Sequence, residues 1–209
     1  SSAQTVYAAT TAGVFKSTNG GGSWTVINSS LTSTWVNALA IDPSSPQTVY
    51  AGTNSGGVFR STNGGSSWTV INNGLTNASV SALAIDPSSA QTVYAGTYGS
   101  VFKSTSGGGS WTTINTGLAG TNVFALSIDP SSAQTIYAGG GGVFKSTNGG
   151  DSWTAISSGL TAGVRALAID PSSTQIVFAG TDGGGVFKST NGGSSWTATN
   201  SGLTSTTVH

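Results

Sequence analysis

Short apolar segments separated by turn-forming residues recur along the whole chain. In the unit that starts at residue 36, Val36–Ile41 is apolar on both faces and is stopped by an Asp-Pro pair. Segments 48–52, 58–61 and 68–71 follow, each rich in Val, Ile, Tyr, Phe, Trp or Thr and each bounded by Gly, Ser, Asn or Pro. This pattern predicts four β-strands, here called a to d. No segment keeps a helical period over about ten residues or more.

The four-strand unit repeats with a nearly constant period. The tryptophan that begins strand d recurs at spacings of 44, 43, 42 and 43 residues. A repeat of this length with four strands indicates the blades of a β-propeller. The sequence starts at strand b (residues 5–9) and continues through four complete units, whose a strands end at Asp42, Asp86, Asp129 and Asp170. We therefore predict an all-β, five-bladed β-propeller with about four antiparallel strands per blade, as a single domain over residues 1–209.

Closure of the ring is incomplete in the sequence. Residues 208–209 align with 36–37 and residues 1–2 align with 44–45, so six residues of an a strand have no counterpart. We expect one blade to be built from both termini, with an incomplete inner strand. Three interpretations stay open: a truncated or engineered chain that closes with a defective blade, a fragment of a longer array, or a vacant position that accepts a strand from another chain. The last would allow strand exchange or oligomerisation at the incomplete blade.

Composition narrows the classes of partner. The chain has four Lys, two Arg, six Asp and no Glu, and its net charge is zero. A nucleic-acid binder needs clustered basic residues to displace counterions, so nucleic acid is not expected as a partner. Basic residues are also too few for a polybasic membrane surface, and no segment approaches the roughly 20 apolar residues of a membrane-spanning helix. Cysteine is absent, and the abundance of Gly, Ser, Thr and Asn favours a secreted or cell-surface protein.

A Gly-rich box precedes strand d in every unit. From Ser17 to Trp24 it reads Ser-Thr-Asn-Gly-Gly-Gly-Ser-Trp. This box resembles the Asp-box, or BNR repeat, whose pattern is Ser-x-Asp-x-Gly-x-Ser/Thr-Trp. That family includes sialidases, xyloglucanases and sortilin-type receptors, so the resemblance implies a propeller without specifying a function. The matching positions are Ser17, Asn19, Gly21, Trp24, Ser61, Asn63, Gly65, Trp68, Ser104, Ser106, Gly108, Trp111, Ser146, Asn148, Gly150, Trp153, Ser189, Asn191, Gly193 and Trp196.

The resemblance implies a structural role for the box. In the family the Asp side chain hydrogen-bonds the hairpin backbone, and the Trp packs between blades. Here Asn replaces the Asp in four boxes and Ser106 replaces it in the third, and both residue types can make such bonds. One basic residue per unit also falls on a strand, where we expect a solvated position. These residues are Lys16, Arg60, Lys103, Lys145 and Lys188.

The catalytic residues of sialidase-like enzymes are absent. The resemblance would require an arginine triad, a tyrosine nucleophile paired with a glutamate, and an acid-base Asp. The chain has only Arg60 and Arg165 and no Glu. The Asp residues that precede Pro are expected to cap turns, one per blade. Asp151 lies in a c-d turn and Asp182 in a b-c turn, which antiparallel strands place on opposite faces. We therefore expect no pair of catalytic carboxylates and no enzymatic activity.

No metal or cofactor is expected. His209 is the only histidine, which excludes a His-based zinc site and a Ser-His-Asp triad. The Gly139–Gly142 run lacks the helix and the Lys-Ser pattern of a phosphate-binding loop, and we expect it to form a tight b-c turn. Segment 182–185 carries one carboxylate, too few for a calcium loop.

The repeats differ from one another on one predicted face. The a-b turns and the boxes are nearly uniform, whereas the b-c and d-a turns vary. Loops on a rigid scaffold carry binding sites, so we place any site on the varied face around the central channel, although neutral drift in a duplicated array would vary the same loops. Aromatic rings that stack on a sugar, beside Asn and Arg for its hydroxyls, favour glycans as the ligand over another protein surface. The candidates are Trp35, Asn37, Asn54, Tyr98, Asn122, Phe124, Arg165 and Asp182.

The sequence thus predicts a non-catalytic binding module or scaffold. Two alternatives stay open. The chain is a fragment of a larger glycoside hydrolase, as the two-propeller xyloglucanases suggest by analogy, or it is a designed or reconstructed repeat protein without a ligand, which the near-identity of the repeats allows.

Overall fold

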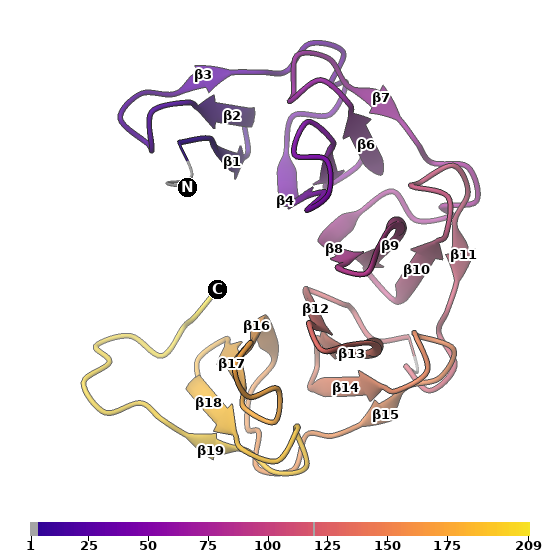
Figure 1. Ribbon diagram of the computed structural model, residues 1–209. Helices are drawn as coiled ribbons and strands as arrows, with labels where there is room; N and C mark the ends of the chain where they lie inside the picture. The colour runs from indigo at the N-terminus through magenta and orange to yellow at the C-terminus, as the bar shows by residue number, and fades with distance from the viewer. Residues whose placement is uncertain (1–3, 119) are drawn as a thin grey trace.

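The computed structural model describes residues 4–118 and 120–209. Its strands form five antiparallel sheets, and Figure 1 shows these sheets side by side around a common centre. Each sheet is one blade, so the predicted β-propeller architecture is confirmed. Within each blade the strands pair in sequence order, because short turns connect neighbouring strands.

The blades are numbered along the chain. Blade 1 contains β1 (Val6–Thr10), β2 (Gly13–Ser17) and β3 (Thr25–Val26), and blade 2 contains β4 (Val36–Ile41), β5 (Val49–Thr53), β6 (Val58–Ser61) and β7 (Thr69–Val70). Blade 3 contains β8 (Val80–Asp86), β9 (Ser89–Thr97), β10 (Ser100–Ser104) and β11 (Thr112–Thr113). Blade 4 contains β12 (Ala125–Asp129), β13 (Ser132–Gly139), β14 (Val143–Ser146) and β15 (Thr154–Ala155). Blade 5 contains β16 (Val164–Ile169), β17 (Val177–Thr181), β18 (Gly185–Ser189) and β19 (Thr197–Ala198).

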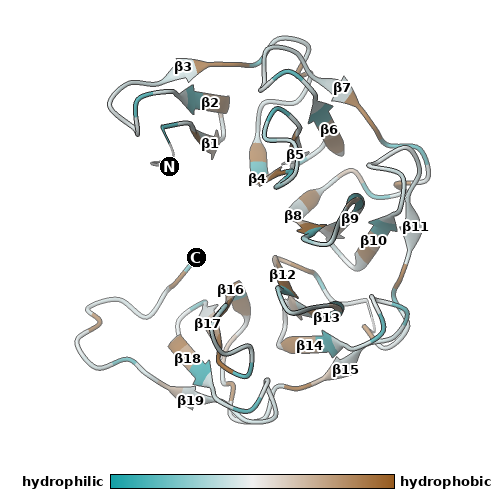
Figure 2. Ribbon diagram, in the orientation of Figure 1, coloured by the Kyte–Doolittle hydropathy of each residue, from teal (hydrophilic) through white to brown (hydrophobic). Residues whose placement is uncertain are grey.

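Within each blade the strands follow one another in order from the centre of the ring to its rim (Figure 1). In Figure 1, β4, β8, β12 and β16 lie nearest the centre and the two-residue strands lie outermost. The outer strands are shorter than predicted, because a side chain ends the ladder: the N–H of Val58 donates to Asn72 Oδ1 at 2.8 Å instead of to a backbone carbonyl. Figure 2 shows a hydrophilic segment on the third strand of each complete blade and on β2, which carry the periodic basic residues.

Blade 1 has three described strands and lacks the inner strand that the other blades contain. The C-terminal segment lies beside blade 5 instead, where the N–H of Val208 donates to the Thr181 carbonyl at 2.9 Å. The side chain of Val208 faces Gly180 as that of Val80 faces Gly52. Val208 therefore occupies the place where an inner strand begins, and Figure 1 shows blades 1 and 5 on the two sides of an opening in the ring.

The box forms a turn held by its own side chains. In the second box, Ser61 Oγ accepts from the N–H of Gly65 at 2.8 Å and donates to Asn63 Oδ1 at 2.8 Å. Asn63 Oδ1 also accepts from the N–H of Ser67 at 3.0 Å, and Asn63 Nδ2 donates to Ser67 Oγ at 2.9 Å. Gly65 has a φ of 90°, a conformation that glycine adopts without strain. The box turn is thus held by hydrogen bonds among its own residues, and the Gly64 N–H adds a bond to the Gln47 carbonyl at 2.8 Å.

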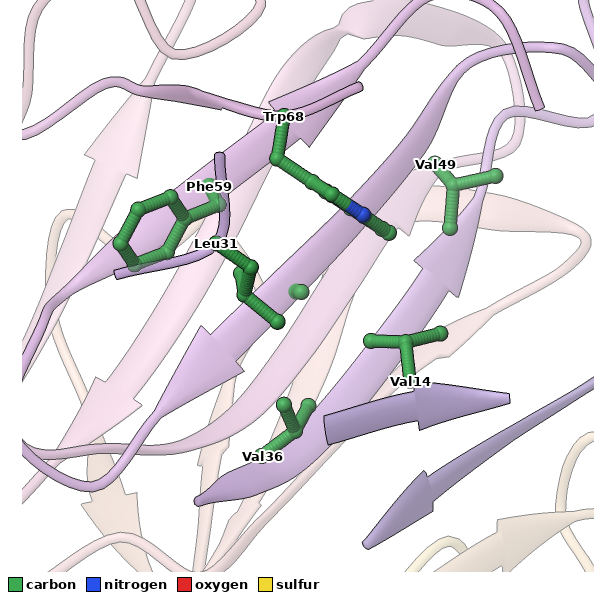
Figure 3. Close-up of a cluster of buried hydrophobic side chains, with 7 residues drawn as sticks. Val14, Leu31, Val36, Val49, Phe59 and Trp68 are labelled. Atoms are coloured by element: carbon green, nitrogen blue, oxygen red, sulfur yellow. The ribbon is translucent and has the colours of Figure 1, made fainter. Parts of the chain in front are cut away.

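The hydrophobic core is divided among the boundaries between blades. At the first boundary, Val14 of blade 1 packs with Val49, Phe59 and Trp68 of blade 2 (Figure 3). The same arrangement recurs at the other three boundaries. Trp24 differs, because no blade formed by the described residues covers it: this residue is 44% exposed, against 3% for Trp68. The implied packing between blades therefore does not hold for this first box tryptophan.

Candidate functional site

The aspartates before proline are used by the turns that they precede. Asp42 Oδ1 accepts from the Ser44 hydroxyl at 2.7 Å, the Ser44 N–H at 2.8 Å and the Ser45 N–H at 3.1 Å. Burial by itself would raise the pKa of Asp42, but these hydrogen bonds outweigh it and the pKa is lowered. At Asp170 the hydroxyl and N–H of Ser172 likewise lower the pKa. These carboxylates stabilise turns and are not free for chemistry.

The periodic basic residues were expected to be solvated, and that prediction is wrong for four of them. Lys16 Nζ donates to the carbonyl of Gly64 in the next blade at 2.9 Å. Arg60, Lys103 and Lys145 make the equivalent bond to a box glycine of the following blade. The long side chain crosses the boundary and lies beside an aromatic ring of its own blade, with Lys16 Nζ 5.4 Å from the Tyr7 ring centroid. These residues connect blades.

An open cleft lies on the varied face where blades 4 and 5 meet. Its volume is about 580 Å³. The d-a loops and the b-c turns line it together, which agrees with their expected placement on one face. The lining residues are Gly120, Thr121, Asn122, Phe124, Gly140, Gly141, Gly163, Arg165 and Asp182.

Arg165 is the centre of the polar part of the cleft. Its Nη2 donates to Asp182 Oδ2 at 2.9 Å, with 34% and 49% of the two side chains exposed. Its Cζ lies 4.2 Å from the ring centroid of Phe124. Tyr98 contacts the same ring edge-on, with centroids 5.7 Å apart at 86°. The ion pair and the ring contact orient the guanidinium, and about a third of the Arg165 side chain remains exposed to the cleft's solvent.

The structure brings together only some of the candidate residues. Asn122, Phe124, Arg165 and Asp182 line the cleft, and Tyr98 borders it through Phe124. The other three candidates, Trp35, Asn37 and Asn54, do not line the cleft.

Those three residues lie at the junction of blades 1 to 3. Trp35 is 54% exposed, and its carbonyl accepts from the N–H of Asn54 at 2.9 Å. Asn37 Nδ2 donates to the carbonyl of Val80 in the next blade at 2.9 Å. The Asn37 amide therefore helps to connect blades 2 and 3.

Sequence reasoning missed the glycines that shape the cleft. The Gly139–Gly142 run forms the expected tight turn, in which the N–H of Gly140 donates to the carbonyl of Gly142 at 2.9 Å. A Cβ at Gly140 would overlap the Asn122 carbonyl, whereas a Cβ at Gly141 would meet no atom within 4 Å. Side chains at these positions would fill the cleft or push its walls apart. The sequence did contain a signal for the cleft: of the five b-c turns, this one consists entirely of glycine and so has no side chains to fill the space.

The cleft contains one carboxylate, that of Asp182, and it is paired with Arg165. Asp151 lines a different depression, together with Lys103, Thr105 and Ser110. Among residues 4–118 and 120–209, no group of three or more His, Cys, Asp or Glu side chains is placed to hold a metal ion. The same part of the chain has no helix that is long and apolar enough to cross a membrane.

Known structures contain the same fold. A crystal structure of AFV00434, an ancestral GH74 enzyme, matches with a TM-score of 0.82 and 28% identity, over 98% of this chain and 30% of that one. The GH74 enzyme of Niastella koreensis matches with a TM-score of 0.71 and 26% identity, over 93% of this chain and 34% of that one. The extracellular domain of the putative hybrid two component system BT4673 from B. thetaiotaomicron matches with a TM-score of 0.74 and 17% identity, over 97% of this chain and 27% of that one.

These comparisons identify the architecture. No protein-family model matches the sequence. No curated protein matches it either. This chain spans about a third of the length of the GH74 enzymes that it resembles. It is a β-propeller similar to those in GH74 enzymes.

Proposed function

We propose that this chain is a non-catalytic β-propeller binding module of the Asp-box type, and that it binds carbohydrate in the cleft between blades 4 and 5. The observation that carries the proposal is the Arg165 guanidinium, held between Asp182 at 2.9 Å and the Phe124 ring at 4.2 Å beside an open cleft. A fixed guanidinium and a carboxylate can share a sugar's hydroxyls, and the half-exposed ring of Tyr98 offers an apolar surface next to them.

The proposal excludes hydrolysis by this chain alone. Glycoside hydrolysis generally uses two carboxyl groups about 5 to 9.5 Å apart. Asp182 is the one carboxylate that lines the cleft, and it is paired with Arg165, so the cleft does not provide two carboxyl groups. Ligand binding without turnover is the function that this inventory supports.

A second candidate is a fragment of a larger glycoside hydrolase. It is favoured by the likeness to GH74 enzymes, of which this chain covers 30% and 34%. In that case the cleft would provide one wall of a substrate groove, and carboxylates from outside these residues would perform the reaction. Both candidates agree with an extracellular location, which the extracellular β-propeller domain of BT4673 also supports.

The test is a glycan-array screen followed by titration calorimetry with any sugar that binds. Gly141→Leu is expected to abolish binding, because its side chain would project into the cleft without meeting another atom first. Ser55→Leu is the matched control, since Ser55 is an exposed residue of the blade 2 b-c turn outside the cleft. Unchanged binding by Gly141→Leu would refute this placement. A blank array with the folded protein would leave the scaffold without a ligand as the better description.

Asp182→Asn separates two classes of sugar. A neutral sugar that uses the carboxylate as an acceptor for its hydroxyls should bind several-fold more weakly. An acidic sugar should bind more tightly, because Arg165 would lose the carboxylate that competes for it.

A hydrolysis assay tests the non-catalytic part of the proposal. We expect the purified chain to show no activity on xyloglucan, and measurable turnover would overturn the non-catalytic proposal.

A further inference from the structure

Asn-Gly pairs are the places where a polypeptide most readily loses an asparagine side-chain amide. The backbone nitrogen of the following residue attacks the asparagine side chain, and glycine has no side chain to obstruct that attack. The sequence contains five such pairs, of which one, Asn73-Gly74, follows strand β7. The other four lie in the boxes, at residues 19–20, 63–64, 148–149 and 191–192.

The four box pairs are restrained by hydrogen bonds at both reacting groups. In each pair the glycine N–H, whose nitrogen would attack, donates to a glutamine carbonyl at 2.8 to 2.9 Å. The asparagine side chain makes three bonds, as described for Asn63. The same three bonds recur at Asn19, Asn148 and Asn191. Attack within a box would require both groups to give up their partners.

Asn73 and Gly74 lack these restraints. Both residues are exposed, and the Gly74 N–H donates to no group among the residues that the structure describes. In the same part of the chain, the Asn73 side chain makes one bond, from Nδ2 to the Gly109 carbonyl. At 3.4 Å this bond is longer than an ordinary N–H···O hydrogen bond. The nitrogen and the side chain that must meet are therefore both available.

The fold requires a glycine after Asn73. Gly74 has a φ of 83°, and a Cβ there would overlap the Trp111 carbonyl of blade 3. The Leu75 N–H closes the turn by donating to the Asn72 carbonyl at 2.9 Å. The equivalent turns of the other blades have Ser or Thr in place of Asn73, at residues 29, 116, 158 and 201. Blade 2 is thus the one blade in which this turn contains an Asn-Gly pair.

We propose that Asn73 is a site of spontaneous deamidation in the folded protein, and that the box asparagines are protected from it. The Gly74 nitrogen, after losing its proton to solvent, bonds to Asn73 Cγ while the Cγ–Nδ2 bond breaks and ammonia leaves. Water then opens the resulting cyclic imide. Opening at Cγ gives aspartate. Opening at the main-chain carbonyl carbon gives isoaspartate, in which the backbone runs through the former side chain. Either route consumes water and releases ammonia.

Both products alter the boundary between blades 2 and 3. The Asn73 carbonyl accepts from the Trp111 N–H at 2.8 Å. In isoaspartate this carbonyl leaves the backbone, so the bond between the blades is displaced. In both products the amide that donates to the Gly109 carbonyl is lost, and a carboxylate is gained on a chain whose net charge is zero. The site lies outside the cleft, so its modification is measurable without a ligand.

Timed incubation of the folded chain at mildly alkaline pH, followed by mass spectrometry of tryptic peptides, tests the proposal. Cleavage after Arg60 and Lys103 leaves Asn63 and Asn73 in one peptide, so fragmentation compares the two sites directly. We expect Asn73 to react roughly tenfold or more faster, because attack at Asn63 must first break several hydrogen bonds. Incubation in urea should make the two rates similar, because unfolding removes those bonds.

Asn73→Ser is the matched control, since Ser is the residue at equivalent positions 29 and 158. It should not form the acidic species that isoelectric focusing detects in the aged wild type, and Asn73→Asp marks where that species migrates. The proposal is overturned if the folded wild type stays unmodified while the urea-treated chain reacts. It is also overturned if Asn63 reacts as fast as Asn73 in the folded chain. Equal melting temperatures of the fresh and modified proteins would contradict the effect on the blade boundary.

Discussion

Trp68 donates its indole N–H to the carbonyl of Ile27, 2.7 Å away in the preceding blade. The bond joins two residues 41 positions apart, and its equivalents repeat around the ring. We predict that Trp68→Phe lowers the free energy of unfolding by about 2 kcal/mol, because it leaves a carbonyl unpaired and a gap in the core. Urea denaturation measures the effect. Trp35→Phe, at a 54% exposed site, is the control and should change stability by less than about 0.5 kcal/mol.

The third box is predicted to be improvable. Ser106 Oγ accepts from the N–H of Ser110 at 3.1 Å, but it has no counterpart of the second bond that Asn63 makes to the Ser67 hydroxyl. Ser106→Asn should add that bond and raise the free energy of unfolding by about 0.5 to 1 kcal/mol. Thermal denaturation measures the change. The reverse substitution, Asn63→Ser, should cost a similar amount, and equal stability of all three proteins would contradict the account.

Stability is predicted to fall in acid through the turn aspartates. The pKa values of Asp42 and Asp170 are lowered in the folded state from 3.8. Their contribution is therefore complete above pH 3.8 and is lost as the pH falls through the lower folded values. Unfolding curves between about pH 2 and 6 measure it. Asp170→Asn should flatten part of this dependence, and so should Ser172→Ala, which removes the hydroxyl that lowers the pKa most. An unaltered slope in both variants would contradict the assignment.

Alkaline pH should destabilise the protein through Tyr94. Burial, followed by the charges of Asp86 and Asp151, raises the pKa of Tyr94 from 10.0 to about 12. A raised folded pKa means that its stabilising contribution is present below pH 10.0 and is lost as the pH rises towards about 12. Tyr94→Phe should lower the free energy of unfolding by about 1 kcal/mol at neutral pH, because it removes the hydrogen bond to the Gly149 carbonyl. When the pH is raised above 10.0, the stability of this variant should fall less than that of the wild type, and urea denaturation over this pH range measures the difference.

The sequence predicted the architecture well because the box and the strand pattern recur in all five blades. The spacing of the tryptophans and the Asp-Pro stops placed the blades, and antiparallel order followed from the short turns. The ends of the strands were harder to predict. The Asn72 side chain ends the hydrogen bonding between β6 and β7, but in the sequence it cannot be told apart from other loop asparagines. The role of Lys16 was missed because its partner, Gly64, is 48 residues away in the next blade. The sequence of a single repeat does not show how closely neighbouring blades approach.

The candidate site was predicted only in part. Sequence comparison between repeats could find the varied face, but not which varied residues are neighbours. Phe124 directly precedes β12 of blade 4, whereas Arg165 lies on β16 and Asp182 follows β17 in blade 5, so the three side chains converge where blades 4 and 5 meet. Asn37 is in the equivalent repeat position to Arg165, yet its short amide reaches only the Val80 carbonyl. The difference is one of side-chain length at a given backbone position, which requires the structure to evaluate.

In the part of the chain that the structure describes, each hydrophobic cluster joins two blades that are neighbours in sequence, so the ring behaves as a one-dimensional array with nearest-neighbour coupling. Blades 2 to 4 each have two covered faces, whereas blades 1 and 5 have one. Amide hydrogens should therefore exchange with solvent fastest in β1 to β3, next in blade 5, and slowest in blade 3. Opening would begin at the ends of the array and proceed inward, so the cleft between blades 4 and 5 has one wall on a blade that opens early.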